Sequence, residues 1–382
     1  MTDKQAEGER LCILVVEDEA SAANPVKAVL EETLGAKVVI AADFKAGLDE
    51  LVSNKSVDAL VLDLYAGNIH EPMFLEGEAI WNHIWSDRFV PIAIHTAAPA
   101  FELDPPVPPD NPFIRAFTKG PTSHGELARF LTDLAPFLHE IRKVSSSIDR
   151  ATSRALRDSS TAIWRATAGN EQARLQLIAA TARRRVAALF DEGMSGRPVD
   201  SSEQYVYPPI AESLMTGDIL RGLSGSPDDP TAYRLVLSPS CDLQMRDGEC
   251  GLADVLVSNC VSFEEFVKTA PTTRQLNLNK LRERLPSLLT QPHVDGYIVL
   301  PAFGNILPCM AADLRRLELI SHGEISPSGN GDRKWSRVAS IDSPFRELLV
   351  WAYLLVAGRP GVPDRDFAGT LGMVAPASGA EE

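Results

Sequence analysis

The chain has 382 residues and a formal net charge of −15, with 45% hydrophobic and 23% charged residues. This length suffices for two or three domains, each with its own core. The acidity argues against a nucleic-acid-binding output domain, which usually carries a basic patch. The only short basic run, at residues 183–185, is typical of a solvated helix face.

No apolar run reaches the length of a membrane-spanning helix. The first ten residues are polar and charged, unlike a signal peptide. The five cysteines are scattered and odd in number, which fits a reducing compartment without structural disulfides. We therefore expect a cytoplasmic protein that does not enter a membrane.

Strand and helix patterns alternate over the first third of the chain. The mostly apolar run at residues 11–16 predicts a strand buried on both faces, and a helix should follow, with Asn24 as its N-cap and Gly35 at its end. Further strands are expected at 37–42, 57–62, 90–95 and 114–118, and further helices at 43–52, at 72–85 and from residue 122. This alternation with short connections predicts a parallel sheet with helices on both faces.

Polar side chains follow the strands of this sheet directly. They are Glu17 and Asp18 after the first strand, Asp63 after the third, Thr96 after the fourth and Lys119 after the fifth. In open α/β sheets, ligands bind at the carboxyl ends of the strands. Because adjacent carboxylates repel unless a cation or a basic side chain lies between them, the sequence predicts a cation site at this edge.

Four segments in the right order resemble the receiver domain of bacterial response regulators over residues 11–143. Residues 13–19 match the opening signature of that family, and residues 59–64 match its phosphoacceptor strand. Residues 92–97 match the strand with the switch hydroxyl, and residues 117–121 match the lysine segment. The resemblance implies an α/β fold with a flavodoxin-like, doubly wound, five-stranded parallel sheet.

The resemblance also implies phosphorelay signalling through Asp63, phosphorylated by a histidine kinase or another phosphodonor. A carboxylate can form an aspartyl-phosphate, and a divalent cation is needed to neutralise the charges that meet there. The implied cofactor is Mg²⁺, held by Glu17, Asp18, Asp63 and the backbone carbonyl of Tyr65.

Two further roles follow from the same resemblance. Lys119 would pair with the phosphoryl group or, in its absence, with Asp63. The hydroxyl of Thr96 would move to bond a phosphoryl oxygen, which is the switching step.

Three departures from the family pattern keep an inert, pseudo-receiver scaffold open as an alternative. An insertion at residues 66–76 follows the phosphoacceptor, and six prolines within residues 97–112 forbid a regular helix there. The aromatic residue usually found three positions before the lysine is replaced by Ala116. Phe117 is one position away, so it should face the other side of the sheet.

Residues 144–200 are expected to form a helical connector. Apolar residues keep a three–four spacing through residues 125–190, which permits a homodimer through this region. Serine, threonine and alanine in the seam make packing against the chain's own domains equally compatible with the pattern.

The remaining residues change character. Residues 201–330 contain short β-rich runs separated by turns, which predicts a small, mainly-β barrel or sandwich. Residues 331–373 should form a helical region, with flexible or disordered ends at 1–10 and 374–382. Residues 216–220 and 233–238 faintly resemble two strands of PemK/MazF-type endoribonucleases, without a matching arginine.

The segment around Cys241 and Asp242 has the strongest site character in this half of the chain. Cys241 is a candidate thiol nucleophile or metal ligand, but no Cys-x-x-Cys pair supports a metal site. Cys250, Cys260 and Cys309 lie in apolar contexts typical of buried structural cysteines. Three functions therefore remain: a response-regulator-like protein controlling a non-DNA-binding module, a scaffold, and a nuclease-like effector enzyme.

Overall fold

The structure is a computed structural model that describes residues 10–63, 88–97, 111–167, 170–193, 200–210, 212–246, 249–327 and 333–359. The chain divides into two compact units, Met1–Ser195 and Gly196–Glu382. The helix expected at 72–85, most of the proline-rich stretch and the two chain ends lie outside the described residues.

Unit 1 is built on a five-stranded sheet in which every pair of neighbouring strands is parallel. Its strands are β1 (Cys12–Val16), β2 (Lys37–Ala41), β3 (Val57–Leu62), β4 (Ile92–Thr96) and β5 (Ile114–Thr118), in the order β2-β1-β3-β4-β5. This is the flavodoxin-like doubly wound order. The predicted fold class is therefore confirmed.

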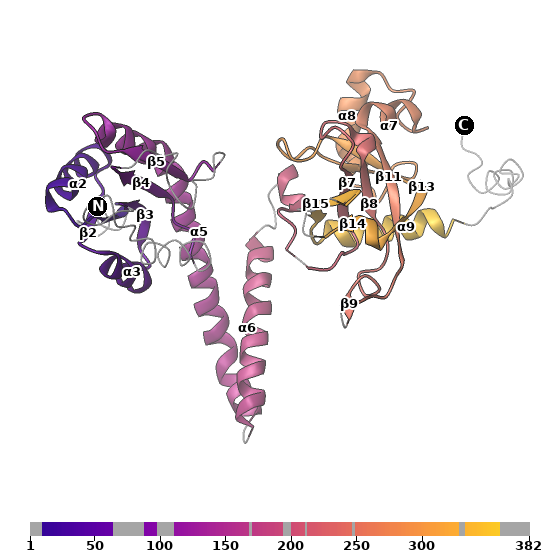
Figure 1. Cartoon of the computed structure of the whole chain (residues 1–382). Helices are drawn as coiled ribbons and strands as arrows, with labels where there is room; N and C mark the ends of the chain where they lie inside the picture. The colour runs from indigo at the N-terminus through magenta and orange to yellow at the C-terminus, as the bar shows by residue number, and fades with distance from the viewer. Residues whose placement is uncertain are drawn as a thin grey trace, which may run out of the picture. The chain divides into compact units, whose positions relative to one another are not determined.

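Helices cover both faces of this sheet (Figure 1), and successive side chains of β1 point to opposite faces. Ile13 lies in the apolar cluster with Leu30 of α2 (Ala20–Leu34) and Leu131 of α5 (Ser123–Ala166). Leu14 points to the other face, into the cluster with Leu51 of α3 (Phe44–Ser53). Each of these five side chains is at most 1% exposed, so the predicted strand buried on both faces is present.

The start of helix α2 differs from the prediction, whereas the orientation of Phe117 agrees with it. Helix α2 begins at Ala20, with Pro25 inside it, so the expected N-cap at Asn24 is wrong. The carbonyl of Glu19 instead accepts the first helical N–H groups, from Ala22 and Ala23, both at 2.9 Å. The expected orientation of Phe117 is confirmed, since its ring packs against Phe130 of α5 with 5.7 Å between ring centroids.

Helix α5 is 44 residues long and continues well past the sheet (Figure 1). Helix α6 (Glu171–Gly193) returns alongside it, so the connector is a helical hairpin. Arg142 fixes α5 to the sheet, because its guanidinium donates to Asp58 at the start of β3 and to the carbonyl oxygen of Arg10. Asp58 also accepts from the backbone N–H of Cys12 at 2.6 Å.

Unit 2 contains an eight-stranded sheet that is antiparallel except for the pair β14–β15. Its strands are β6 (Tyr205–Val206), β7 (Asp218–Gly222), β8 (Tyr233–Val236), β11 (Asp254–Ser262), β12 (Tyr297–Leu300), β13 (Met310–Ser321), β14 (Ile325–Ser326) and β15 (Trp335–Ile341). Strands β9 (Met245–Arg246) and β10 (Glu249–Cys250) form a separate two-stranded sheet. The helices are α7 (Phe263–Thr269), α8 (Leu278–Leu289) and α9 (Phe345–Ala357). The predicted mainly-β module followed by a helix is confirmed.

A buried ion pair lies within unit 2. The side chains of Arg337 on β15 and Asp218 on β7 are 1% and 0% exposed, with 3.3 Å between Nη1 and Oδ2. Burial raises the pKa of Asp218, against the opposing effects of its hydrogen bond from Ser340 and of the Arg337 charge. Arg337 also donates to the carbonyl of Ser213 at 3.0 Å, which ties the segment before β7 to the sheet.

Candidate functional site

The strand register brings Glu17 and Asp63 together. Val16 is paired with Leu62 in the parallel β1–β3 ladder, so the residue after each strand emerges at the same level. The backbone N–H of Asp63 donates to the carbonyl of Val16 at 3.0 Å. The backbone N–H of Glu17 donates to Ala41 of β2 at 3.1 Å, which fixes the first acidic residue from the other side.

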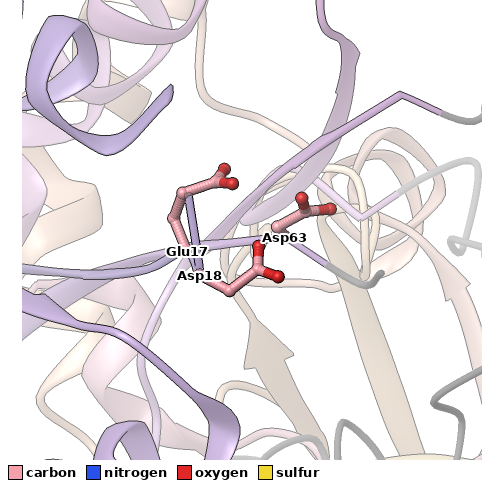
Figure 2. Close-up of side chains that lie close together, drawn as sticks. All are labelled: Glu17, Asp18 and Asp63. Carbon is pink, nitrogen blue, oxygen red and sulfur yellow. The ribbon is translucent and has the colours of Figure 1, made fainter. Parts of the chain in front are cut away.

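Three carboxylates gather at this edge of the sheet. Oxygen atoms of Glu17, Asp18 and Asp63 all lie within 4.8 Å of one another, around a common space (Figure 2). Glu17 and Asp63 are buried, at 5% and 7% exposure, whereas Asp18 is exposed. A buried carboxylate pair needs a compensating cation, because like charges in a poorly solvated position repel strongly.

Lys119 supplies one positive charge to this cluster. Its Nζ lies 2.6 Å from Oδ2 of Asp63 and 2.7 Å from the nearer carboxylate oxygen of Glu17. Burial alone would lower the pKa of Lys119, but its hydrogen bonds to Asp63 and Glu17 outweigh burial and raise it. Burial raises the pKa of Glu17, and the hydrogen bond from Lys119 only partly opposes that shift.

The donor set fits a hard divalent cation. Three carboxylates against one ammonium leave the site with a formal excess of two negative charges, and Asp18 faces solvent, where a cation can enter. Few carboxylates with open positions for water and substrate oxygens are what Mg²⁺ prefers. The expected fourth ligand, the carbonyl of Tyr65, lies outside the described residues.

Thr96 ends β4 at the same edge of the sheet. It is 1% exposed, and its carbonyl accepts from the backbone N–H of Lys119 at 2.7 Å. Because Thr96 is paired with Thr118, the last residues of β4 and β5 emerge together. The structure thus gathers Glu17, Asp63 and Lys119 into one cluster and holds the backbone of Thr96 against Lys119.

One residue at this edge was not singled out from the sequence. His95, 2% exposed, lies next to Thr96, and its Nε2 is 3.1 Å from Oγ of Ser123 at the start of α5. Burial and the charge of Lys119 lower the pKa of His95 to about 4, so its imidazole is neutral near pH 7. A histidine directly after the apolar residues 92–94 was the available sequence signal, and it marks a link between β4 and α5.

The second candidate segment, around Cys241, does not form a comparable cluster. Cys241 is exposed and its Sγ contacts Asp242, at 3.5 Å from Oδ1. Cys260 is buried as expected, but Cys309 is exposed and Cys250 half-buried, so the expectation of three buried cysteines is wrong. Within the described ranges, the only group of acidic, histidine or cysteine residues placed to hold a metal is the one at Glu17.

Comparisons with known proteins cover only part of the chain. No family model matches it, and neither does any curated protein. Similar solved structures include a response regulator receiver domain from Bacillus halodurans, at 17% identity over 34% of this chain and 97% of that one, with a TM-score of 0.25. A CheY-like receiver domain from Methanospirillum hungatei is 18% identical over 34% of this chain and 98% of that one, with a TM-score of 0.28.

A third similar structure is a complex of the P1 domain of CheA3 with CheY6 from R. sphaeroides. The identity is 21% over 32% of this chain and 95% of that one, with a TM-score of 0.25. Because these TM-scores are low, the fold of unit 1 is assigned from its own strand order and register and not from its similarity to these structures. The similar structures give no support to the PemK/MazF resemblance of the C-terminal part. None of the described helices is both long and apolar enough to cross a membrane. The chain is thus similar to receiver domains over about a third of its length.

Proposed function

We propose that this chain is a response-regulator-like signalling protein that accepts a phosphoryl group on Asp63. The single observation that carries the proposal is the geometry of Lys119, whose ammonium lies between Asp63 and Glu17 at the carboxyl edge of the sheet. A carboxylate held beside a cation is a suitable oxygen nucleophile, and its protein neighbours can balance the incoming charge.

Each residue of the cluster has a distinct task in this reaction. An oxygen of Asp63 attacks the phosphorus of the donor, such as a phosphohistidine of a histidine kinase, and the P–N bond of the donor breaks. Lys119 then exchanges its contact with Asp63 for one with a phosphoryl oxygen. Mg²⁺, held by Glu17, Asp18 and Asp63, would neutralise the phosphoryl oxygens when bound.

Phosphorylation would control unit 2 through the hydroxyl of Thr96. Its place at the end of β4, with its carbonyl held by Lys119, supports a role in sensing the phosphoryl group. Only contacts that differ between the two states can transmit such a signal. The segment after Thr96, which is rich in proline, differs from the family pattern, so we expect an output surface different from that of the family.

The test is the intact mass of the full chain after incubation with acetyl phosphate and Mg²⁺. We expect one added phosphoryl group, which is released by hydroxylamine and absent in Asp63→Asn. Asp49→Asn, which changes an exposed carboxylate on α3, is the matched control and should be modified like the wild type. Equal labelling of Asp63→Asn would place the acceptor elsewhere, and no labelling of any variant would favour the scaffold.

We also propose that the hairpin of α5 and α6 forms a homodimer. Large apolar side chains stay exposed on both helices, including Val144 at 56%, Trp164 at 58% and Leu175 at 62%. Light scattering on the full chain should give twice the monomer mass. Leu175→Glu should shift this to the monomer, whereas Arg184→Glu, at an exposed polar position of the same helix, should not.

A further inference from the structure

A pocket lies at the edge of the unit 1 sheet opposite the carboxylate cluster. It has a volume of about 1020 Å³ and is lined by residues that begin β1, β2 and β3. One wall comes from α5, between Leu138 and Asp149. The pocket therefore lies between the amino edge of the sheet and α5.

Positive charge dominates the described wall of this pocket. Five basic side chains line it, against two carboxylates, Asp58 and Asp149. The basic residues are Arg10, Lys37, Lys55, Arg88 and Arg142. In a chain with a net charge of −15, a concentration of positive charge on a concave surface calls for an explanation.

Two of these five cations serve the fold. Arg142 is paired with Asp58, and Arg88 donates to the carbonyls of Leu51 and Asn54 at the end of α3. The other three, Arg10, Lys37 and Lys55, are exposed and have no ion pair or side-chain hydrogen bond to any other described residue. Charges of the same sign around a cavity repel one another, and an anion bound between them offsets this repulsion.

The same pocket has an apolar side that a simple inorganic anion would not need. Phe89 lines it and is 54% exposed, with its ring edge-on to Phe113 at 5.1 Å. Leu138 and Ile141 of α5 extend the apolar surface, and Ser145 and Ser146 add hydroxyl groups. The pocket volume of about 1020 Å³ is at the upper end of the range for small organic ligands, and the ring of Phe89 offers a face on which a planar group can stack.

We propose that this pocket binds a phosphorylated small molecule of nucleotide size. Lys37, Lys55 and Arg10 take the phosphate groups, and the ring of Phe89 stacks on the base. The ligand contacts both the amino edge of the sheet and the part of α5 between Leu138 and Asp149. The site is separate from Asp63 and is independent of the proposed phosphorylation.

Calorimetric titration of the full chain tests the proposal with ATP, pyrophosphate and adenosine as probes. The buffer is free of divalent metals, which keeps magnesium-bound nucleotide away from the carboxylate cluster. We expect ATP to bind, pyrophosphate to bind more weakly and adenosine not to bind, with affinity falling as salt is added. Pyrophosphate binding as tight as that of ATP, or adenosine binding as tight as that of ATP, would overturn the proposed ligand class.

Two variants connect binding to the pocket. Lys37→Glu combined with Lys55→Glu should weaken ATP roughly tenfold or more, because both lysines lose their attraction and gain repulsion. Lys45→Glu, at an exposed position of α3 that does not line the pocket, is the matched control and should bind like the wild type. Phe89→Ala should abolish the preference for ATP over pyrophosphate. Unchanged ATP affinity in the double variant, or no binding of ATP and pyrophosphate to the wild type, would refute the proposal.

Discussion

Replacing Lys119 by methionine tests whether the carboxylate cluster depends on a cation. Methionine keeps most of the aliphatic length of lysine but removes the ammonium that lies within 2.7 Å of both Asp63 and Glu17. The side chains of these acids are 8% and 3% exposed, so they would face each other with little water to screen them. We expect Lys119→Met to lower the free energy of unfolding of unit 1 when Mg²⁺ is absent.

The magnitude follows from the burial of the three groups. Removing one partner of a buried ion pair costs about 3–5 kcal/mol. The side chain of Lys119 is 24% exposed, so solvent screening reduces the expected loss to about 2–3 kcal/mol. For a unit of this size, 1 kcal/mol shifts the melting temperature by about 2–4 °C, which predicts a decrease of about 4–12 °C.

Differential scanning calorimetry of the full chain measures this shift with and without Mg²⁺. Adding Asp63→Asn to Lys119→Met removes one of the repelling charges and should recover at least about 1 kcal/mol. Mg²⁺ should raise the melting temperature of Lys119→Met more than that of the wild type, because only the variant lacks a cation in the cluster. A loss below about 0.5 kcal/mol, or further destabilisation by Asp63→Asn, would refute this electrostatic account.

Three other predictions concern single groups. The pKa of His95 is about 4 in the folded chain instead of the ordinary 6.5. As the pH drops from 6.5 to 4, His95 takes up a proton in the unfolded chain but stays mostly neutral in the folded one, so the free energy of unfolding should fall by about 3 kcal/mol. Denaturant titrations across this range should show a flatter profile for His95→Asn, and a profile as steep as that of the wild type would exclude His95 as the cause. Arg337→Met leaves Asp218 buried without its cation and should destabilise unit 2 by about 3–5 kcal/mol. Adding Asp218→Asn should recover part of this loss, and calorimetry showing that the losses of the two single variants add would contradict the prediction. The carboxylate of Asp58 accepts the hydrogen bond from the backbone N–H of Cys12 and is held by Arg142. Arg142→Ala should therefore speed hydrogen exchange at the N–H of Cys12, and unchanged exchange there would contradict the role given to Arg142.

The sequence predicted the elements of unit 1 well because the first third of the chain repeats a strong local pattern. The side chains of the apolar run before Glu17 are shielded from water on both faces only in a strand inside a sheet that helices cover on both sides. The observed β1 is buried throughout. Asp63, Thr96 and Lys119 were predicted at strand ends because each directly follows an apolar strand. Local errors arose where backbone hydrogen bonding decided the outcome, as at the start of α2, where Glu19 and not Asn24 is the N-cap.

What the sequence determined by itself was the alternation of strands and helices and the identity of the charged residues between them. The distance from Lys119 to Asp63, the depressed pKa of His95 and the pocket beside α5 depend on strand order and helix length, which join residues far apart in the chain. Arg142 and Asp58 are 84 positions apart and carry no signal of pairing in their local sequence. Only the packing of α5 against the sheet brings them together, because burial and electrostatic fields depend on neighbours in space and not on neighbours in sequence.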